Sequence, residues 1–544
     1  MNKIKAIIFD LDDTLANTSG TIKFKIASKA LKVLNPNKNL EEELKKHYES
    51  GLSITASLKK IGLEQSISEQ TIKKSIKVYS EDLDVEGIKL FKGVRELLDS
   101  LSKKYYLALV TTGFGLRQQK KIDLLDIKKY FEEIHIDETY DKENAYYNIR
   151  QKLGLLPQSV LVVGNKLKKD LLPAKNLGFL TVLVGNTKTK DSTDYIVNNV
   201  LDINKVLKDM EFKEQKLSKG KKITLIGGGT GAPTLAQGLR KYTKNIEVIV
   251  TCTDRGRSSG RLHKELNVLP PGDVRNNIIA LSQSEKLLND LFQYRFEEGS
   301  LKGHTLGNLF IVALTKMLGS FEKAIEHTSK ILNLSGKIIP ASPHTTEICA
   351  ELEDGTVLKG EQAVVVKGDA VNKISRPPIK RAWLEPNVKA SKSAVKSILQ
   401  SDLVVIGPGS LITSVLPPLL HEEIIDALKK TKAKKVYVCN IVTQSGQTQN
   451  FSAKDHADMI QQHIGKVLDF VVVNTKKPKQ EILKSYEESK AFIVEITDDL
   501  YKQNYEVVAK DLIEEIIEKK ILWEKDNLLR HDSEKIAKIL MKIK

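Results

Sequence analysis

The segment from Ile4 to Thr14 reads IKAIIFDLDDT, and it decides the fold of the first part of the chain. Its first six residues are mostly apolar and have the length of a buried strand. Asp10 stands where this strand ends, and Asp12 follows two residues later in the expected turn. Two carboxylates at this spacing can hold Mg²⁺ while one of them attacks phosphorus. Turn capping is the alternative use of an Asp at the end of a strand.

Further strands and helices follow this segment. Apolar runs of strand length occur at Tyr106 to Val110 (YLALV) and at Val160 to Val163 (VLVV), and the runs KFKIASKALKVL and GVRELLDSL have apolar positions at helical spacing. Alternating strands and helices indicate a parallel sheet with helices on its faces. We therefore expect an α/β domain over residues 1–212, with residues of about 16–95 inserted as a helical cap.

The run FDLDDT resembles the DxDxT motif of the haloacid-dehalogenase-like (HAD-like) superfamily. The resemblance implies that Asp10 is the nucleophile that forms an aspartyl-phosphate. It makes Asp12 the general acid and base, which also gives a backbone carbonyl to the metal. Thr111, in VTTGF, matches the residue that binds the phosphoryl group, and Lys142 matches the lysine that balances its charge. Asp170 matches an acidic metal ligand, so the metal set is Asp10, Asp12 and Asp170.

Two departures from the HAD-like pattern affect this interpretation. The proline that often follows the motif lysine is absent after Lys142, and the usual first Asp of the acidic motif is Asn165. Asn165 still offers a neutral oxygen and Asp170 remains anionic, so Mg²⁺ binding can survive with weaker charge compensation. The alternatives are a phosphatase of small phosphorylated metabolites and a HAD-like fold that has lost catalysis. The substrate is set by cap residues, whose arrangement the sequence does not show.

A second domain is expected from residue 221 onward. The run KEQKLSKGKK (213–222) is polar and charged, so we place a linker at residues 213–220 and the second domain at 221–544. Ile223 to Ile226 is a strand that opens a new series, which continues with EVIVTCT, DLVVIG, KVYVCN and DFVVVN. This pattern predicts a second Rossmann-like, doubly wound parallel sheet.

A glycine-rich loop follows the first strand of this domain. The run Gly227-Gly-Gly-Thr-Gly-Ala232 precedes a predicted helix, PTLAQGLRKY. Glycines let the backbone approach a ligand closely, and a helix N-terminus favours an anion. The loop departs from GxGxxG and lacks the lysine of a P-loop, so a tight turn is the alternative interpretation.

Several other polar runs accompany the glycine loop, and some directly follow apolar strands. They are DRGRSSGRL (254–262), LPPGDVRNN (269–277), LFQYRF (291–296), GHTLGN (303–308), AELEDGT (350–356), GPGSLITS (407–414) and CNIVTQSGQT (439–448). In an open parallel sheet, the loops at the carboxyl ends of the strands meet in one crevice. Their amides, hydroxyls and arginines can therefore converge on a nucleotide diphosphate.

In order and wording these runs resemble the YvcK-like gluconeogenesis-factor proteins of the CofD superfamily. The resemblance implies binding of a UDP-sugar such as UDP-N-acetylglucosamine, with a role in gluconeogenic growth, central carbon metabolism and cell shape. The implied nucleotide-binding residues are Gly228, Gly229, Thr230, Gly231, Asp254, Ser258, Ser259, Asp273, Arg275, Asn308, Gly407, Gly409, Ser410, Tyr486 and Arg530.

The acidic run of this family is altered here, because Arg255 and Arg257 stand where the family has Asp and Gly. Added cations attract a diphosphate but disfavour a second metal ion. This favours a UDP-sugar-binding regulatory module over the alternative, a CofD-like transferase that moves a phospholactyl group from a nucleotide diphosphate to a deazaflavin alcohol. His304 and His456 have no carboxylate partner identifiable from sequence, which favours structural roles for both.

The composition excludes several classes of protein. The chain has 544 residues, 41% of them hydrophobic, and only three cysteines, which indicates an ordinary globular protein of a reducing cytoplasm without a redox cofactor. Neither a signal peptide nor an apolar run of spanning length is evident. The net charge of +17 is spread along the chain among 69 acids, with 6% aromatic residues, so nucleic acid is not the expected partner. Homo-oligomerisation stays open.

Overall fold

The computed structural model describes residues 4–50, 52–139, 141–185, 193–253, 257–284, 286–365, 376–514 and 529–543. The chain divides into two compact units, Met1–Lys213 and Glu214–Lys544. Residues 213–220, expected to form a linker, are helical as far as Ser218, because α9 spans Ile203–Ser218.

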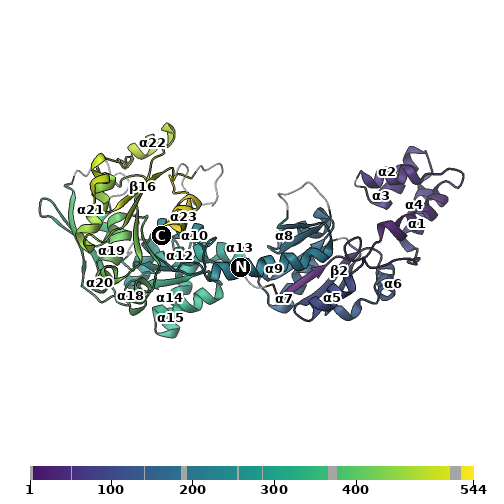
Figure 1. Ribbon diagram of the computed structural model, residues 1–544, viewed down its shortest axis with the longest axis horizontal. Helices are drawn as coiled ribbons and strands as arrows, with labels where there is room; N and C mark the ends of the chain where they lie inside the picture. Colours follow the sequence, from purple (N-terminus) through teal and green to yellow (C-terminus); the bar gives the residue numbers. More distant parts are fainter. Residues whose placement is uncertain are drawn as a thin grey trace. The chain divides into compact units, whose positions relative to one another are not determined.

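The first unit is built on a six-stranded parallel sheet in the order β3-β2-β1-β4-β5-β6 (Figure 1). Its strands are β1 (Ala6–Phe9), β2 (Tyr106–Thr112), β3 (Glu133–Asp137), β4 (Val160–Gly164), β5 (Leu180–Val184) and β6 (Tyr195–Val197). The strand order reverses between β1 and β4, so the segments that follow these two strands lie side by side at the carboxyl edge. The predicted α/β fold is confirmed.

Both faces of this sheet are covered, which explains the nearly continuous apolar strands. Successive residues point to opposite faces: Ile7 and Phe9 belong to one core, whereas Ala6 and Ile8 belong to the other. The helices of the sheet layer are α5 (Val94–Ser102), α6 (Gly115–Leu125), α7 (Lys142–Leu153), α8 (Leu172–Asn176) and α9.

The cap is a separate group of helices between β1 and β2. It begins with a π-helical turn, Ser19–Lys23, and continues with α1 (Phe24–Leu34), α2 (Glu41–Glu49), α3 (Ile54–Glu64) and α4 (Glu69–Glu81). These four helices pack around a small core of their own, in which Leu31, Leu58 and Ile72 take part. The cap helices therefore end at Glu81, and α5, which overlaps the expected cap boundary near residue 95, packs on the sheet instead.

The second unit is built on a seven-stranded parallel sheet in the order β16-β15-β14-β13-β7-β8-β9. Its strands are β7 (Ile223–Ile226), β8 (Ile246–Val250), β9 (Lys337–Pro340), β13 (Leu403–Ile406), β14 (Lys434–Val438), β15 (Phe470–Asn474) and β16 (Glu506–Lys510). The order reverses between β7 and β13, where the loops at 227–231 and 407–410 begin. A ligand crevice is expected at such a reversal.

Helices cover both faces of the second sheet. Leu403 and Val405 of β13 face one core, while Val404 and Ile406 face the other. The helices are α10 (Gly231–Leu239), α11 (Arg257–Leu266), α12 (Gly272–Leu281), α13 (Lys286–Gln293), α14 (Leu306–Leu318), α15 (Phe321–Ile331), α16 (Glu361–Val364), α18 (Lys392–Leu399), α19 (Leu416–Leu419), α20 (Glu422–Lys430), α21 (Ala453–Ile464), α22 (Gln480–Glu487) and α23 (Ser533–Lys542). A small antiparallel sheet of β10 (Glu347–Leu352), β11 (Val357–Lys359) and β12 (Ile379–Glu385) packs against the core that contains Val404 and Ile406.

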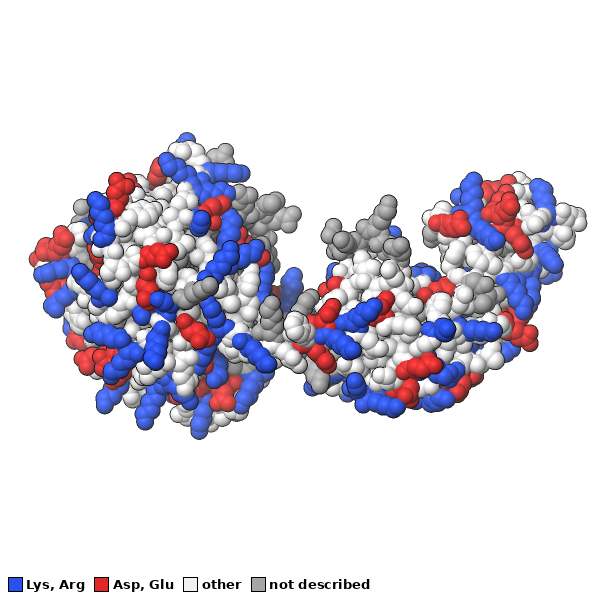
Figure 2. Space-filling model, viewed as in Figure 1, with Lys and Arg blue, Asp and Glu red and all other residues white. Residues whose placement is uncertain are grey.

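The charged residues are intermixed on the surface. Figure 2 shows Lys and Arg interspersed with Asp and Glu on the displayed face of each unit. Among the residues that the structure describes, no helix is both long enough and apolar enough to cross a membrane.

Candidate functional sites

The first site lies where β1 and β4 end. Lys142, at the start of α7, donates from Nζ to Asp10 Oδ1 at 2.6 Å and to Asp170 Oδ1 at 2.8 Å. The Lys142 side chain is only 1% exposed, so this is a buried ion-paired cluster. Thr14 Oγ1 donates to the second oxygen of Asp10 at 3.1 Å. The structure thus brings three sequence-predicted residues, far apart in the chain, into direct contact.

Burial governs the electrostatics of this cluster. It raises the pKa of Asp10 to about 6, although the Lys142 ammonium acts in the opposite direction. Burial would also lower the pKa of Lys142, but the carboxylates of Asp10 and Asp170 outweigh it and raise that pKa above its usual value. Lys142 is therefore held as a cation beneath the carboxylate that the sequence assigns as nucleophile.

Asp12 has a set of partners that the sequence did not reveal. Its Oδ1 accepts from Lys121 Nζ at 2.7 Å and from Thr18 Oγ1 at 2.7 Å, and its Oδ2 accepts from Gln118 Nε2 at 2.9 Å. Burial alone would raise the pKa of Asp12, but the Lys121 charge and these hydrogen bonds hold it below its usual range. Gln118 and Lys121 lie three residues apart on α6, one face of a helix. This spacing after a strand end was the available signal.

Three buried polar atoms at this site have no hydrogen-bond partner among the described residues. They are Thr111 Oγ1, on a residue that is fully buried, Gln118 Oε1 and Asn165 Oδ1. Unpartnered buried polar atoms are uncommon, and a bound group is one explanation for them. A phosphoryl oxygen would accept from the Thr111 hydroxyl, as the sequence predicts.

The same residues bear on metal binding. Among the described residues, no group of three or more His, Cys, Asp or Glu is arranged to hold a metal ion. The available donors are instead two carboxylates, Asp10 and Asp170, and the amide oxygen of Asn165. An all-oxygen set of this kind fits a hard cation such as Mg²⁺. Lys166 N donates to Asp170 Oδ2 at 2.8 Å, which orients that carboxylate.

A cavity of about 720 Å³ opens beside this cluster, between the sheet edge and the cap; we call it the cap cavity. Asp10, Asp12 and Asp170 line its inner end, and Lys23, Tyr48 and Ile54 of the cap line its outer part. Arg117 fastens α6 to the cap, since its guanidinium donates to the backbone carbonyls of Tyr79, Ser80 and Asp82. The volume of the cap cavity lies within the range of small-molecule binding sites.

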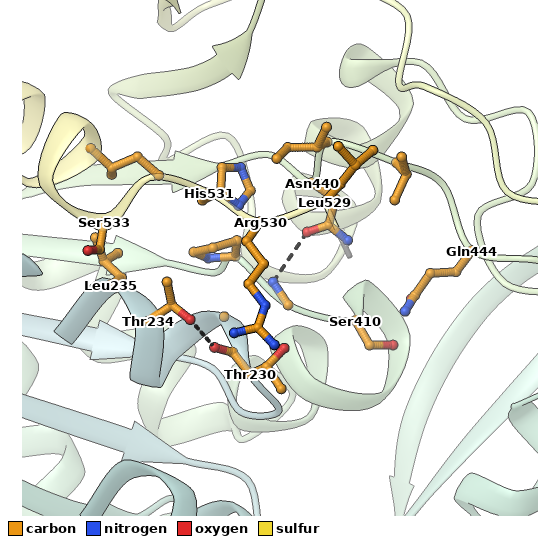
Figure 3. Close-up of a pocket in the computed structure, with 16 residues that line it drawn as sticks. Thr230, Thr234, Leu235, Ser410, Asn440, Gln444, Leu529, Arg530, His531 and Ser533 are labelled. Atoms are coloured by element: carbon orange, nitrogen blue, oxygen red, sulfur yellow. Dashed lines mark hydrogen bonds between the residues drawn. The ribbon is translucent and has the colours of Figure 1, made fainter. Parts of the chain in front are cut away.

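The second site lies at the strand reversal between β7 and β13. The two glycine loops touch: a Cβ added to Gly231 would collide with the backbone of Pro408 and Gly409. Gly409 N donates to Asn440 Oδ1 at 3.2 Å, which ties the loop after β14 to the same point (Figure 3). Only glycine lets these backbones approach so closely.

A pocket of about 210 Å³ lies between these loops; we call it the glycine-loop pocket. Thr230, Gly231, Gly409, Ser410 and Arg530, all predicted from sequence, line it. Figure 3 shows the Arg530 side chain extending toward Thr230. The volume is smaller than that of a typical ligand site, so this pocket can hold part of a nucleotide sugar. Its remaining lining includes Thr234, Asn440, Gln444 and His531. The first three lie in runs that were quoted from the sequence but were not themselves named, and His531 was not identified from sequence.

Tyr486 lies near this pocket. Its hydroxyl accepts a hydrogen bond from Leu529 N at 2.8 Å, next to Arg530. Burial raises the pKa of Tyr486, with the Arg530 charge acting against it. Tyr486 of α22 and Leu529 of the C-terminal segment, which are 43 positions apart in the chain, are thus neighbours.

Several of the other predicted nucleotide-binding residues, among them Ser258, Arg275 and Asn308, form a second group, which does not line the glycine-loop pocket. Ser258 Oγ accepts from Asn308 Nδ2 at 3.1 Å and lies 3.0 Å from His304 Nδ1. Arg275 donates to Thr305 Oγ1. Ser259 is buried beside Ser258 on α11, and Asp254 falls outside the described residues.

The glycine loop connects the two groups. A Cβ on Gly228 would collide with the carboxylate of Asp273, whereas one on Gly229 would approach Ser414 Oγ at 3.2 Å. Gly407, opposite, has a φ of +72°, a conformation that favours glycine. Asp273 therefore faces the start of the loop, and the glycine-loop pocket lies at its other end.

The two histidines considered from sequence have backbone or hydroxyl partners. His456 Nδ1 bonds to Ser452 O at 2.9 Å within the capped start of α21, and His304 bonds to Ser258. Burial lowers the pKa of both side chains, with the charges of Arg261 and Arg295 contributing at His304. Both imidazoles are therefore held neutral.

Comparisons with known proteins match each unit separately. Residues 223–513 match the family model of the 2-phospho-L-lactate transferase CofD, and residues 7–184 match that of haloacid dehalogenase-like hydrolases. The gluconeogenesis factor of Bacillus subtilis is 41% identical over 323 residues, which cover 59% of this chain and 97% of the relative. The gluconeogenesis factor of Halalkalibacterium halodurans is 39% identical over 326 residues, 59% of this chain and 96% of the relative. A crystal structure of a UPF0052-family protein from Bacillus halodurans has a TM-score of 0.54 at 38% identity and covers 59% of this chain and 99% of that one.

Proposed function

We propose, since the chain belongs to the gluconeogenesis-factor family of CofD-like proteins and carries a haloacid-dehalogenase-like domain before it, that it joins two functions in one protein. The second unit binds a UDP-sugar, such as UDP-N-acetylglucosamine, and acts as a regulatory module of central carbon metabolism and cell shape. The first unit is a Mg²⁺-dependent phosphatase of small phosphorylated metabolites.

The meeting of two glycine loops at a strand reversal carries the UDP-sugar proposal. Backbone amides of residues 228–231 and of Ser410 would contact the diphosphate, and the N-terminus of α10 adds a favourable dipole. The uridine would lie near Tyr486 and Arg530, which adjoin the glycine-loop pocket. The sugar would extend along the glycine loop toward Asp273, because the pocket alone holds only part of such a ligand.

A thermal-shift panel of nucleotides and nucleotide sugars tests this proposal. A ligand at 100 times its Kd stabilises its domain by about 2.7 kcal/mol. Arg530→Ala should weaken UDP-N-acetylglucosamine binding by roughly 1.5 to 3 kcal/mol, the usual worth of a hydrogen bond to a charged group. Arg381→Ala is the matched control, since Arg381 pairs with Glu351 on the small antiparallel sheet. Equal shifts for both variants would contradict the assigned site.

A CofD-like transferase is the second candidate for this unit, because the matched family model carries that name. Such an enzyme would use a nucleotide diphosphate-linked donor and a deazaflavin alcohol. Of the acidic run, Asp254 alone remains in the sequence, with Arg255 and Arg257 beside it. This charge reversal favours binding of a diphosphate over binding of a metal ion. Group transfer in the presence of GDP-linked donor and deazaflavin would reverse the preference.

The contact of Lys142 with both Asp10 and Asp170 carries the phosphatase proposal. The Asp10 carboxylate attacks phosphorus, the ester P–O bond breaks, and an aspartyl-phosphate forms. Water then hydrolyses this intermediate, with Asp12 taking a proton from the water and giving it to the leaving oxygen in the next turnover. The Thr111 hydroxyl and the Lys142 ammonium bind the phosphoryl oxygens. Mg²⁺, held by Asp10, Asp170, the Asp12 carbonyl and Asn165 Oδ1, would neutralise phosphoryl charge.

Phosphate release from a broad panel of phosphomonoesters, in buffer with Mg²⁺, tests this activity. Asp10→Asn should abolish turnover because the amide is not a nucleophile toward phosphorus. Asp99→Asn, an exposed acid on α5, serves as the matched control. Equal phosphate release by wild type and Asp10→Asn would refute the assignment.

A further inference from the structure

Several cations of the cap cavity have no part in the phosphoryl chemistry. Of the six Lys and Arg side chains that line the cavity, Lys121 is bound to Asp12 and Arg117 to backbone carbonyls of the cap. The other four are Lys23, from the cap, and Lys166, Lys168 and Lys169, from the segment between β4 and α8. Only three carboxylates line the same cavity, and Lys142 and Lys121 already bind them.

The segment after β4 presents its lysines next to the metal-binding acid. It reads Asn165-Lys-Leu-Lys-Lys-Asp170, and all three of its lysines line the cavity. Among the described residues, neither Lys166 nor Lys168 forms an ion pair with a carboxylate. The carboxylate of Asp170 is occupied by Lys142 and by the backbone N–H of Lys166. Positive charge is thus gathered here beyond what the local acids balance.

The cap contributes a polar group opposite this segment. Lys23 Nζ donates to Tyr48 Oη at 3.0 Å and to Ser19 Oγ at 2.6 Å, and pairs with Asp13 at 3.1 Å. Tyr48 is also close enough to Lys166 to feel its charge: burial would raise the pKa of Tyr48, but the hydrogen bonds and the two lysines lower it. The Tyr48 hydroxyl therefore lies in a positive environment between cap and sheet edge.

Apolar side chains of the cap also line this cavity. Ile22, Ile26, Leu52 and Ile54, all from the cap, line the cavity together with the lysines. A phosphoryl group occupies only a small part of about 720 Å³. The remaining space suits a short carbon skeleton that leads from Asp10 toward the lysines.

We propose that the cap cavity selects phosphomonoesters that carry a second anionic group, a carboxylate or a second phosphate, bound by Lys166 and Lys168 of the segment after β4 and by Tyr48 and Lys23 of the cap. This inference rests on the proposed phosphatase function, since it names the substrate class of the same site. Lys166 and Lys168 are exposed residues on the wall of this cavity. Their like charges repel one another, and a bound anion reduces that repulsion.

Binding of phosphonates to the full-length protein tests this selectivity without requiring turnover. The probes are propylphosphonate, 3-phosphonopropionate and propane-1,3-bisphosphonate, titrated by calorimetry in the presence of Mg²⁺. They share a three-carbon skeleton, and only the last two carry a second anion. We expect the two probes with a second anionic group to bind roughly tenfold tighter than propylphosphonate, because one hydrogen bond to a charged group usually contributes about this much. The tighter of the two identifies the second anion as carboxylate or phosphate.

Lys166→Met should remove most of this difference, whereas Lys175→Met, an exposed lysine on α8 outside the cavity, should leave it intact. Equal affinity of the wild type for all three phosphonates would overturn the inference, as would an unchanged preference in Lys166→Met. Hydrolysis of p-nitrophenyl phosphate, measured in parallel, reports separately on the proposed phosphatase. If the protein hydrolyses p-nitrophenyl phosphate but binds all three phosphonates equally, only the proposed selectivity is refuted. If it shows the binding preference but no hydrolysis, only the proposed phosphatase activity is refuted.

Discussion

Replacing Gly231 by alanine tests whether the two glycine loops of the second unit form one binding surface. Gly231 begins α10, and its Cα faces the loop after β13. An added Cβ would lie 2.5 Å from the Pro408 carbonyl carbon and 3.0 Å from Gly409 N, with the Pro408 oxygen closer still. Ordinary Cβ contacts begin at 3.4 Å, so the loops would have to part by about 1 Å. Both partners are backbone atoms, which cannot turn away as a side chain could.

We expect Gly231→Ala to destabilise the second unit by about 1 to 3 kcal/mol, the usual cost of overpacking. It should also weaken UDP-N-acetylglucosamine binding at least tenfold, because parting the two loops would disturb the glycine-loop pocket that both of them line. Gly299→Ala provides the control. Gly299 has a φ of +68° and no atom within 4 Å of an added Cβ, so its substitution strains the backbone by a comparable 1 to 2 kcal/mol without disturbing the crevice.

Denaturant unfolding and calorimetric titration of both variants would separate stability from binding. If Gly231→Ala is destabilised and binds weakly while Gly299→Ala is destabilised and binds normally, the loops form the site. If Gly231→Ala binds the nucleotide sugar as tightly as the wild type, the contact between the loops has no role in binding and the reasoning fails.

Three further predictions concern single side chains: Lys142, His531 and Asn165. Lys142→Met leaves Asp10 and Asp170 without their counter-ion, and removing one partner of a buried pair costs about 3 to 5 kcal/mol. Thermal melts should therefore show marked destabilisation of the first unit, and phosphatase activity should be lost. An unchanged melting temperature would contradict this prediction. Burial lowers the pKa of His531 to about 4, so the folded state holds this side chain neutral. Its stabilising contribution is therefore present above pH 6.5 and is lost as the pH falls toward 4, which lowers the free energy of unfolding by about 3 kcal/mol. His531→Gln should flatten that dependence in denaturant titrations at several pH values, and an identical slope would count against it. Asn165→Asp adds a carboxylate to the metal donors, so half-maximal phosphatase activity should need roughly tenfold less Mg²⁺, whereas an unchanged requirement would exclude Asn165 as a ligand.

Much of the first unit's sheet edge was accessible from sequence. Asp10 directly follows an apolar strand, Thr111 lies within one, and Asp170 stands six residues after the end of β4. Asp10, Thr111 and Asp170 are brought to one edge by parallel strands, as a strand–helix alternation requires. Lys142 begins a helix, and it was found only through the family pattern. The spacing of Gln118 and Lys121 shows that they share one face of α6, but that this face meets Asp12 depends on the rotational setting of α6 relative to the sheet, which the local sequence does not determine.

The second unit shows the same division. The loops at 227–231 and 407–410 were expected to meet, because each of them follows the carboxyl end of a strand in the same parallel sheet. The close approach of Asp273 to Gly228, where an added Cβ would collide with the carboxylate, could not be predicted from sequence, because it depends on where α12 packs. The small antiparallel sheet also escaped prediction: its pairing of Cys349 with Trp383 joins residues far apart in sequence, and such pairing is specified by long-range contacts.

Calorimetric titration of the full-length protein with UDP-N-acetylglucosamine tests the central claim most directly. We predict a saturable heat at one site per chain, with an affinity that Asp10→Asn leaves unchanged and that Arg530→Ala weakens about 10- to 150-fold, which corresponds to the 1.5 to 3 kcal/mol of a charged hydrogen bond. Absence of heat with UDP-N-acetylglucosamine, together with group transfer from a GDP-linked donor to a deazaflavin alcohol, would contradict the regulatory interpretation and establish the transferase in its place.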